Sequence, residues 1–477
     1  MGRLRNTGSL LEHNAARGHL LAAESPRLAL HRPVGHGGLV SEVVAPVARV
    51  IVIGAGIAGL AAASRLHRGG IPHVVLESRD RLGGRLCTVD LAGVPVDLGG
   101  SWIHHPIGNP LSTLCDEYGL ARVPGDPIPT LTAFDRREHR RLDRCEVEEF
   151  LRLVIDGFED AIASLRDRLA PEATALDAIE AFIVERGFVG AFARRARQVL
   201  LAEIEADAGD RAVSQSIRWL GDEEQYGGEL FGDLPLDGYR SVVEALAAPL
   251  DVKFNTEVVS VKIANDGVAV TCADGSVETG SHTIVTVPLG VLKDGRPRFD
   301  PALPPPVQAA VETLGFGRYE KIALRFDTAF WRGEGISHAV LFPSEDHEPA
   351  MWVFDLDAFG AGPVLCAHLF HSVSHLALNR STTEAATWLK DVLSEVIGYS
   401  VPEPIATVVT SWAHDPFTGG AYTHCPPGAD SSMFRLLAQP VEGRLLLAGE
   451  HTDGERTGYA DGAYTSGLRA AGMLVGD

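Results

Sequence analysis

The sequence lacks several features that would each define a class of protein. Its six cysteines are scattered and include no Cys-x-x-Cys pair, so neither a zinc site nor a disulfide framework is predicted. No apolar run is long enough to cross a bilayer. The 42 basic residues are outnumbered by 63 acidic ones, and the net charge of -21 argues against a nucleic-acid partner. We therefore expect a cytoplasmic protein that binds neither nucleic acid nor a membrane.

Lysine is also scarce, because only five of the 42 basic residues are lysines. Arginine thus serves nearly everywhere that positive charge alone is required, and a retained lysine indicates a need for lysine itself. One of the five, Lys321, begins the stretch Lys-Ile-Ala-Leu-Arg-Phe, which is typical of a strand. The alternative is a solvated lysine at a strand edge, the usual environment of this residue type.

Residues 1–45 lack the hydrophobic core of a signal peptide, and we interpret them as a disordered leader. The 477 residues are too many for one core, which predicts two domains. The predicted strands are 50–53, 73–76, 258–263, 268–272, 282–287 and 444–448, and the predicted helices lie within 146–209 and from about 462. Because strands from distant segments must share one sheet, we expect the domains to interleave.

The strongest positive signal is a glycine pattern, Gly54-x-Gly56-x-x-Gly59, that directly follows a short β-branched run. Gly54 allows a tight turn, Gly56 lets the backbone approach a pyrophosphate, and Gly59 lets a helix lie close to the sheet. After a further apolar run comes Glu77, whose carboxylate can accept hydrogen bonds from a ribose. Strand, glycines, helix, strand and acid in this order predict a dinucleotide site, whereas the glycines alone could form an ordinary turn.

Several further motifs follow in a fixed order: RLGGR after Glu77, GGSWIH, TVPLGVLK, LGFG-x3-K ending at Lys321, and AGEHT with GYADGA near the end. With this set the chain resembles the flavin-dependent amine oxidases, a group that includes monoamine oxidases, polyamine oxidases and lysine-specific histone demethylases. The resemblance extends from about Val47 to the end of the sequence.

The resemblance implies an α/β fold, in which a Rossmann-like FAD-binding domain is interleaved with an α+β substrate-binding domain. We assign residues 46–104, 232–300 and 402–477 to the first domain. Residues 105–231 and 301–401 form the second, which contains a helical insertion.

The cofactor implied by the resemblance is FAD. Its binding residues would be Gly54, Gly56, Gly59, Glu77, Arg79, Arg81, Gly84, Arg85, Gly99, Gly100, Ser101, Trp102, Val258, Trp412, Gly449, Glu450, Tyr459 and Ala460. Monoamine oxidases carry a flavin-linked cysteine at the position of Ala421, so we expect noncovalent FAD.

The resemblance also implies catalytic roles for Lys321, Tyr422 and Tyr459. Lys321 corresponds to the lysine that holds a water beside flavin N5 and promotes reoxidation by O2. The two tyrosines correspond to those that flank the amine, which a pair of electron-rich rings attracts by cation–π interaction. His104 and Phe417 are further candidates for the substrate cavity. The alternative for each tyrosine, taken singly, is an ordinary core residue, and the alternative for His104 is a structural histidine.

The predicted activity is oxidation of a mono- or polyamine to an imine or aldehyde, with O2 as acceptor and release of H2O2. The partners are then a small amine and O2, and a homodimer is left open. The nearest alternative is an L-amino acid oxidase or a biosynthetic α-amine oxidase, in which an arginine stands where this chain has Trp102.

Three further functions fit the sequence less well. Phytoene-desaturase-like chemistry does not need the tyrosine pair. A nonenzymatic binding protein, as in GDP-dissociation inhibitors, would lose the glycines and Lys321. Histone demethylation is not expected, because neither a helical tower nor a partner-binding domain fits the length.

Overall fold

The structure is a computed structural model that describes residues 47–124, 131–220, 226–228 and 230–476. The predicted leader therefore lies outside the described residues. Within the described ranges, no helix combines the length and the apolar character needed to span a membrane. The six cysteines are all free thiols.

The first of two large sheets is parallel and has five strands. Their order is β22 (Leu445–Leu447), β13 (His282–Val285), β1 (Val50–Ile53), β2 (His73–Leu76) and β9 (Val252–Lys253). Strands β1 and β2 are almost entirely buried, which explains their β-branched sequences. Segments from both ends of the chain thus share this sheet, as the sequence predicts.

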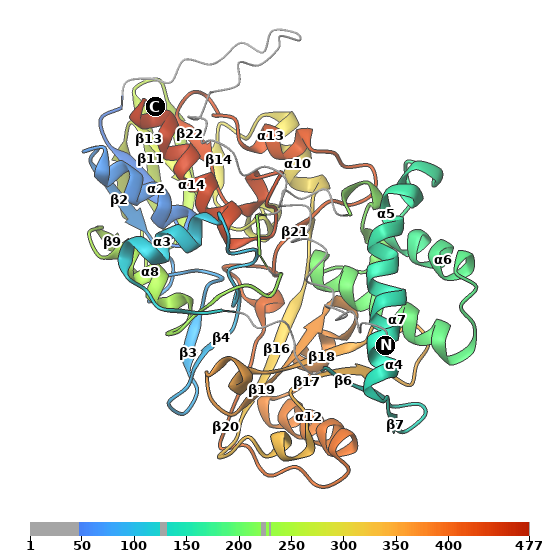
Figure 1. Cartoon of the computed structure of the whole chain (residues 1–477). Coiled ribbons are helices and arrows are strands. Elements are labelled where there is room, and N and C mark those ends of the chain that lie inside the picture. The colour runs from blue at the N-terminus through green and yellow to red at the C-terminus, as the bar shows by residue number, and fades with distance from the viewer. Residues whose placement is uncertain (1–46, 125–130, 221–225, 229, 477) are drawn as a thin grey trace, which may run out of the picture.

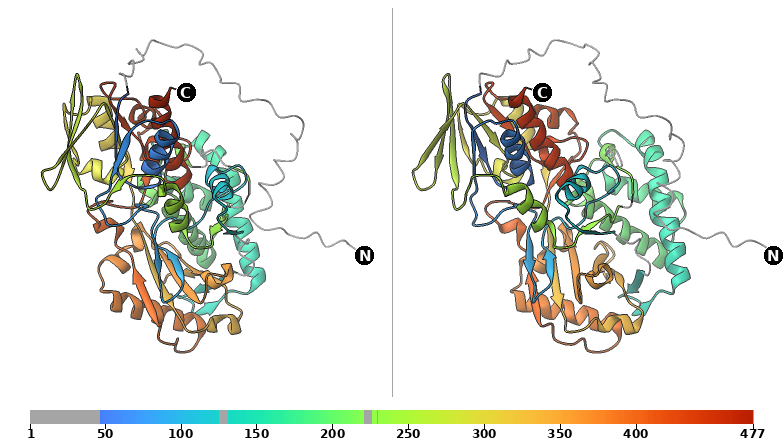
Figure 2. Two further views of the ribbon diagram at one scale, coloured as in Figure 1. Left: turned by 90° about the vertical axis from the view of Figure 1, so that its left-hand side faces the viewer. Right: turned by 60° about the vertical axis from the view of Figure 1, so that its left-hand side comes forward.

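Helices α2 (Ile57–Arg68) and α14 (Ala460–Val475) lie side by side on one face of this sheet (Figures 1 and 2). The other face is covered by a four-stranded sheet. Its strands, in order, are β12 (Val277–Gly280), β11 (Gly267–Cys272), β10 (Val258–Ala264) and β14 (Arg298–Asp300). The first and last helical segments of the described chain are therefore neighbours.

The second large sheet has seven strands. Their order is β20 (Ala406–Val409), β16 (Tyr319–Arg325), β19 (Val364–Phe370), β18 (Met351–Asp355), β17 (His338–Phe342), β6 (Leu131–Asp135) and β7 (Arg140–Arg141). Four helices cover one face: α4 (Arg144–Leu151), α5 (Gly157–Arg168), α6 (Ala175–Glu185) and α7 (Gly190–Ala208). Helix α12 (Thr382–Ile397) packs against the other face, as Figure 1 shows.

Shorter elements connect these layers. The remaining α-helices of the described residues are α3 (Pro110–Tyr118), α8 (Tyr239–Ala247), α9 (Leu289–Lys293), α10 (Pro305–Thr313), α11 (His375–Leu378) and α13 (Ser432–Leu437). The remaining strands are β3 (Thr88–Asp90), β4 (Pro95–Asp97), β5 (Arg122–Val123), β8 (Leu234–Pro235), β15 (Gly315–Phe316) and β21 (Thr423–His424).

The predicted α/β class is confirmed, and β1 and β2 have the predicted bounds. At one point the strand pairing differs from the expected division. Strand β20 belongs to the range 402–477, expected in the FAD-binding domain, yet it pairs with β16 in the seven-stranded sheet. β20 thus lies beside β16, the strand that carries Lys321. Such pairing between distant segments cannot be predicted from local sequence.

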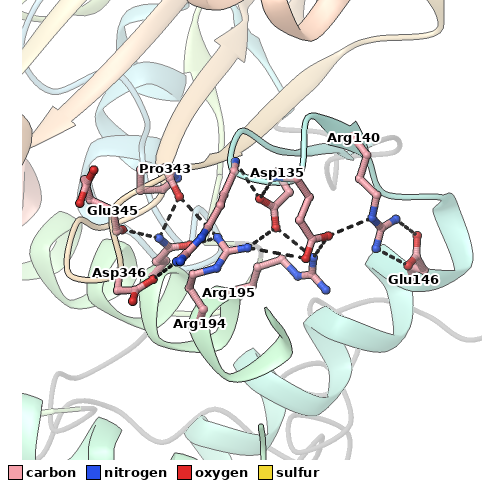
Figure 3. Close-up of polar contacts among 11 residues, drawn as sticks. Asp135, Arg140, Glu146, Arg194, Arg195, Pro343, Glu345 and Asp346 are labelled. Atoms are coloured by element: carbon pink, nitrogen blue, oxygen red, sulfur yellow. Dashed lines mark hydrogen bonds and ion pairs between the residues drawn. The ribbon is translucent and has the colours of Figure 1, made fainter. Parts of the chain in front are cut away.

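A buried ion-pair network ties α7 to the seven-stranded sheet. Asp135, fully buried at the end of β6, pairs with Arg194 at 2.6 Å and with Arg195 at 3.0 Å. Figure 3 shows both guanidinium groups converging on this carboxylate. Burial alone would raise the pKa of Asp135, but the hydrogen bonds from Arg194 and from the Glu138 N–H hold it below its usual value. The network therefore fixes where α7 lies.

Replacing Asp135 with alanine leaves two buried guanidinium groups without their carboxylate. We expect a loss of about 3–5 kcal/mol in the free energy of unfolding, measured by urea denaturation. The matched control is Asp346→Ala, which removes only the exposed partner of Arg137 and is expected to cost less than about 1 kcal/mol. Equal effects of the two substitutions would contradict a clamping role for Asp135.

Candidate active site

The turn between β1 and α2 is shaped for a close backbone approach. Gly54 has a φ of +101°, and an added Cβ would lie 2.6 Å from the Thr286 hydroxyl oxygen. A Cβ on Gly59 would lie 1.9 Å from the Gly54 carbonyl oxygen. Gly56 caps α2 without a side-chain hydrogen bond, and an added Cβ would meet nothing closer than 3.9 Å. The first N–H groups of α2 can therefore bind an anion such as a diphosphate.

Glu77 lies directly after β2, beside this turn. Its buried carboxylate accepts hydrogen bonds from the N–H groups of Ala55 at 2.7 Å and Arg79 at 2.9 Å. The Arg79 guanidinium in turn pairs with Asp415 at 2.6 Å and lies 5.1 Å from the centre of the Phe417 ring. The acid is thus held at the carboxyl end of a strand, where such folds place a ribose.

A second buried carboxylate connects the C-terminal segments to the cofactor cradle, the name used here for the turn of residues 54–59, Glu77 and residues 79–85. Glu450, 3% exposed, accepts from Arg85 Nη1 at 2.9 Å, from the Thr423 hydroxyl at 3.1 Å and from the Gly458 N–H at 3.1 Å. Burial alone would raise the pKa of Glu450, but the charge of Arg85 and the hydrogen bonds from Arg85 and Thr423 together hold it below the usual value. Arg85 also donates to the Ala421 carbonyl at 2.6 Å. These contacts hold three distant segments together.

The Gly99–Gly100 turn lies between the two sheets. A Cβ on Gly99 would lie 1.7 Å from the Arg85 carbonyl oxygen, so the two backbones touch. Trp412 also contacts this turn, because its Nε1 donates a hydrogen bond to the Leu98 carbonyl at 3.1 Å. The Trp412 N–H donates to the buried carboxylate of Glu320 at 2.9 Å, which orients the tryptophan.

The remaining predicted cofactor residues lie around the same cradle. Arg81 donates to the Gly84 carbonyl at 2.9 Å, and Gly449 has a φ of +140°. Val258 opens β10, just after a segment that bonds to the carbonyls of residues 77 and 79, and Ala460 begins α14. The glycine turn, the open helix start and the two carboxylates fit the diphosphate and ribose of a dinucleotide such as FAD.

Lys321 reaches from β16 to the glycine turn. Its Nζ donates to the carbonyls of Asp97 at 3.1 Å and Gly99 at 2.7 Å and to the Ser101 hydroxyl at 2.8 Å. The residue is 5% exposed, and this burial lowers its pKa. A cavity of about 40 Å³ adjoins it, lined by Asp97, Ser101, Trp102, Cys366 and His368 among others. This space can hold a water molecule.

Six rings form a continuous series beside this ammonium, here called the aromatic series. Its members in order are Tyr422, Tyr319, His368, Trp102, His104 and Tyr459. Successive ring centroids are 6.0, 5.6, 5.9, 6.3 and 5.4 Å apart. A Cβ on Gly458 would lie 3.6 Å from Tyr422 Cδ2, which brings the two ends together. The structure therefore gathers both predicted tyrosines and His104 at one site.

Both histidines of the series are held neutral. Burial lowers the pKa of His104 to about 4, and its Nδ1 lies 2.5 Å from the Leu230 carbonyl oxygen. His368, 2% exposed, has a pKa lowered well below its usual value by burial and by the charge of Lys321. Its Nδ1 is hydrogen-bonded to the Tyr319 hydroxyl at 2.6 Å. The charge of Lys321 thus opposes protonation of the nearby His368.

The C-terminal half of α7 brings two acids to the same region. Glu203 and Asp207 are four residues apart, on one side of the helix. Glu203 is half-buried, and burial raises its pKa to about 7, with contributions from Glu159 and Asp207, whereas Asp207 is exposed. The Ala206 carbonyl between them accepts the Tyr422 hydroxyl. The acids are therefore close to the aromatic series.

Phe417 lies apart from this group. Its ring lies 5.1 Å from the guanidinium carbon of Arg79, which is itself beside Glu77. A role in the substrate cavity stays a prediction that this placement does not support.

Tyr319 and His368 were missed by the sequence reasoning. Tyr319 is two residues from Lys321 in one strand, so a face-by-face reading could have found it. His368 lies directly opposite Lys321 in β19, a register that the sequence does not reveal.

Comparison with known proteins identifies the relatives of this chain. The profile of the family described as flavin containing amine oxidoreductase matches residues 57–475. The chain is 31% identical to polyamine oxidase 4 of Oryza sativa subsp. japonica, over 88% of this chain and 87% of that protein. It is 32% identical to a probable polyamine oxidase 4 of Arabidopsis thaliana, over 88% and 86% of the two chains.

Histone demethylases are also similar. The chain is 30% identical to lysine-specific histone demethylase 1 homolog 3 of Oryza sativa subsp. japonica, over 89% of this chain but 54% of that protein. It is 31% identical to human lysine-specific histone demethylase 2, over 89% and 53%. The chain thus spans about half the length of the demethylases that it matches.

Proposed function

We propose, from the premise that this chain belongs to the family of flavin-containing amine oxidoreductases, that it oxidises an amine with FAD and O2 and releases an imine or aldehyde and H2O2. The observation that carries the proposal is the buried ammonium of Lys321. It lies beside the aromatic series and is bonded to the glycine turn of the cofactor cradle. Bound flavin would supply the acceptor for two electrons and the α-hydrogen of the amine.

The aromatic series would bind and orient the amine. Tyr422 and Tyr459 offer electron-rich rings, while the neutral histidines add no charge. Desolvation in this setting favours the unprotonated amine, whose lone pair is required for oxidation at the α-carbon. Lys321 would hold a water in the adjoining cavity and stabilise the superoxide anion that forms as O2 is reduced.

Within this activity we favour a diamine or polyamine substrate. Glu203 and Asp207 lie near the aromatic series and could pair with a second ammonium group of a long amine. A monoamine has no such group. The similarity to polyamine oxidases over nearly the whole of both chains supports this choice.

Noncovalent binding of FAD is proposed from Ala421. Its side chain has no atom that could form a bond to the cofactor, while its carbonyl accepts Arg85 at 2.6 Å at the edge of the cradle. The free thiols support the proposal of a reducing compartment such as the cytoplasm.

Acid or heat denaturation should release the flavin into solution. We expect the supernatant to contain all of the flavin absorbance and to chromatograph as FAD, because the cradle offers hydrogen bonds and charge but no covalent attachment. Flavin that stays with the washed precipitate would contradict noncovalent binding, and free FMN would contradict the dinucleotide assignment.

Peroxide release should depend on the length and charge of the amine. A peroxide-coupled screen with putrescine, spermidine, spermine, tyramine, phenethylamine and the common amino acids tests this proposal. We expect turnover with the polyamines and little with the amino acids. Glu203→Gln should lower kcat/KM for spermidine by about tenfold, mainly through KM, and leave that for tyramine unchanged.

The same experiment has a pH signature and a matched control. Glu203 must be ionised to pair with an ammonium, so spermidine affinity should fall as pH drops through about 7. The control is Asp167→Asn, on the exposed side of α5, which should leave kcat/KM for spermidine and for tyramine unchanged. Turnover of amino acids alone would instead favour an L-amino acid oxidase, and no turnover would contradict the proposed function.

Replacing Lys321 with methionine should slow the oxygen-dependent half of the cycle. We expect about a hundredfold decrease in the rate of oxygen uptake after anaerobic reduction by substrate, because a fixed positive charge is lost. The reductive half should change much less. The exposed Lys262→Met variant is the control. An unchanged rate with oxygen in Lys321→Met would contradict the role assigned to the ammonium.

A further inference from the structure

A buried arginine lies against one ring of the aromatic series. The guanidinium carbon of Arg456 is 4.0 Å from the centre of the Tyr459 ring and 5.2 Å from that of Tyr226. The side chain is only 4% exposed. Because a ring has two faces and the guanidinium covers one of them, an amine can approach Tyr459 only from elsewhere.

A hydrogen-bond network fixes this guanidinium. Its Nε and Nη2 lie 2.9 and 2.8 Å from the same oxygen of Asp461, which is 3% exposed. The same oxygen accepts from Asn109 Nδ2 at 3.0 Å, and Asn109 Nδ2 also donates to the His104 carbonyl at 2.8 Å. Arg456, Tyr459 and His104 are therefore held as one unit at the end of the aromatic series.

Glycine at position 462 is required for this arrangement. An added Cβ there would lie 2.1 Å from the Arg456 carbonyl oxygen. The start of α14 thus lies directly against the backbone of the arginine, and the guanidinium has little freedom to withdraw from the ring. A charge held in this way acts on whatever binds at the other side of Tyr459.

The charged and titratable groups around Arg456 come from several elements. They are Asp461 on α14, Asp453 before it, Asp207 on α7, His104 and His105 in the loop before α3, and the two tyrosines. Of these, Asp461 is the paired counterion, and both histidines have lowered pKa values to which the charge of Arg456 contributes. The guanidinium is in direct contact with the Tyr459 ring.

We propose that Arg456 is a specificity-determining residue that makes the aromatic site select the unprotonated amine. This inference rests on the proposed amine oxidation. A cation fixed on one face of Tyr459 repels a second cation at the other face and weakens the attraction of that ring for an ammonium. The neutral amine suffers no such repulsion. The site therefore binds the form of the amine that can be oxidised, while the acids of α7 remain free to hold a distal ammonium.

The pH dependence of kcat tests this proposal in two directions. In Arg456→Met the apparent pKa of the bound amine should rise by about one unit, so that kcat one unit below the wild-type pKa falls about tenfold. In Asp461→Asn the cation remains and its counterion is lost, so the same pKa should fall. Lys retains the charge but not the planar contact, and Arg456→Lys should keep the wild-type profile.

Each outcome is decisive because the substitutions differ in sign. Opposite shifts in Arg456→Met and Asp461→Asn support the proposal, and identical profiles in all variants overturn it. Should Arg456→Met fail to retain flavin, the comparison of Asp461→Asn with Arg456→Lys still decides, since packing alone predicts no shift in either. If the wild-type protein turns over no amine, the proposed function itself is refuted. If it turns over amines but the pH profiles of kcat are unshifted in the variants, only the role of Arg456 is refuted.

Discussion

The buried ammonium of Lys321 is the constraint on which the rest of the site depends. A desolvated lysine must find hydrogen-bond acceptors, and here they are the carbonyl at the end of β4 and a carbonyl and a hydroxyl of the turn that follows it. That requirement brings the seven-stranded sheet against the glycine cradle of the parallel sheet. The aromatic series then occupies the junction, with Lys321 at its side and the acids of α7 nearby.

Other contacts support the same junction from a distance. The Arg85–Glu450 pair joins the cradle to the C-terminal segments. Asp135 holds the N-terminal end of α7 through Arg194 and Arg195. Because α7 is a regular helix, anchoring its N-terminal end also restricts the position of the two acids near its C-terminal end. The position of these two acids therefore depends on the whole fold rather than on one loop.

Local sequence was sufficient for features that lie within one segment. The glycine turn, the two strands that flank it and the strand that carries Lys321 follow from periodicity and residue type. The opposition of Lys321 and His368 did not follow, because strand register depends on packing between segments far apart in the chain. The same reason explains why β20 pairs with β16 and why Phe417 lies on Arg79. Arg456 has no sequence signal, since nothing local marks a buried arginine.

The most direct measurement mixes the flavin-loaded protein with spermidine in the absence of oxygen and follows the visible flavin absorbance. If the cradle, Lys321 and the aromatic series form one amine-oxidising site, the absorbance should bleach in a substrate-dependent reaction and return when oxygen is admitted. A protein that holds flavin but keeps its absorbance with every amine tested would contradict the account.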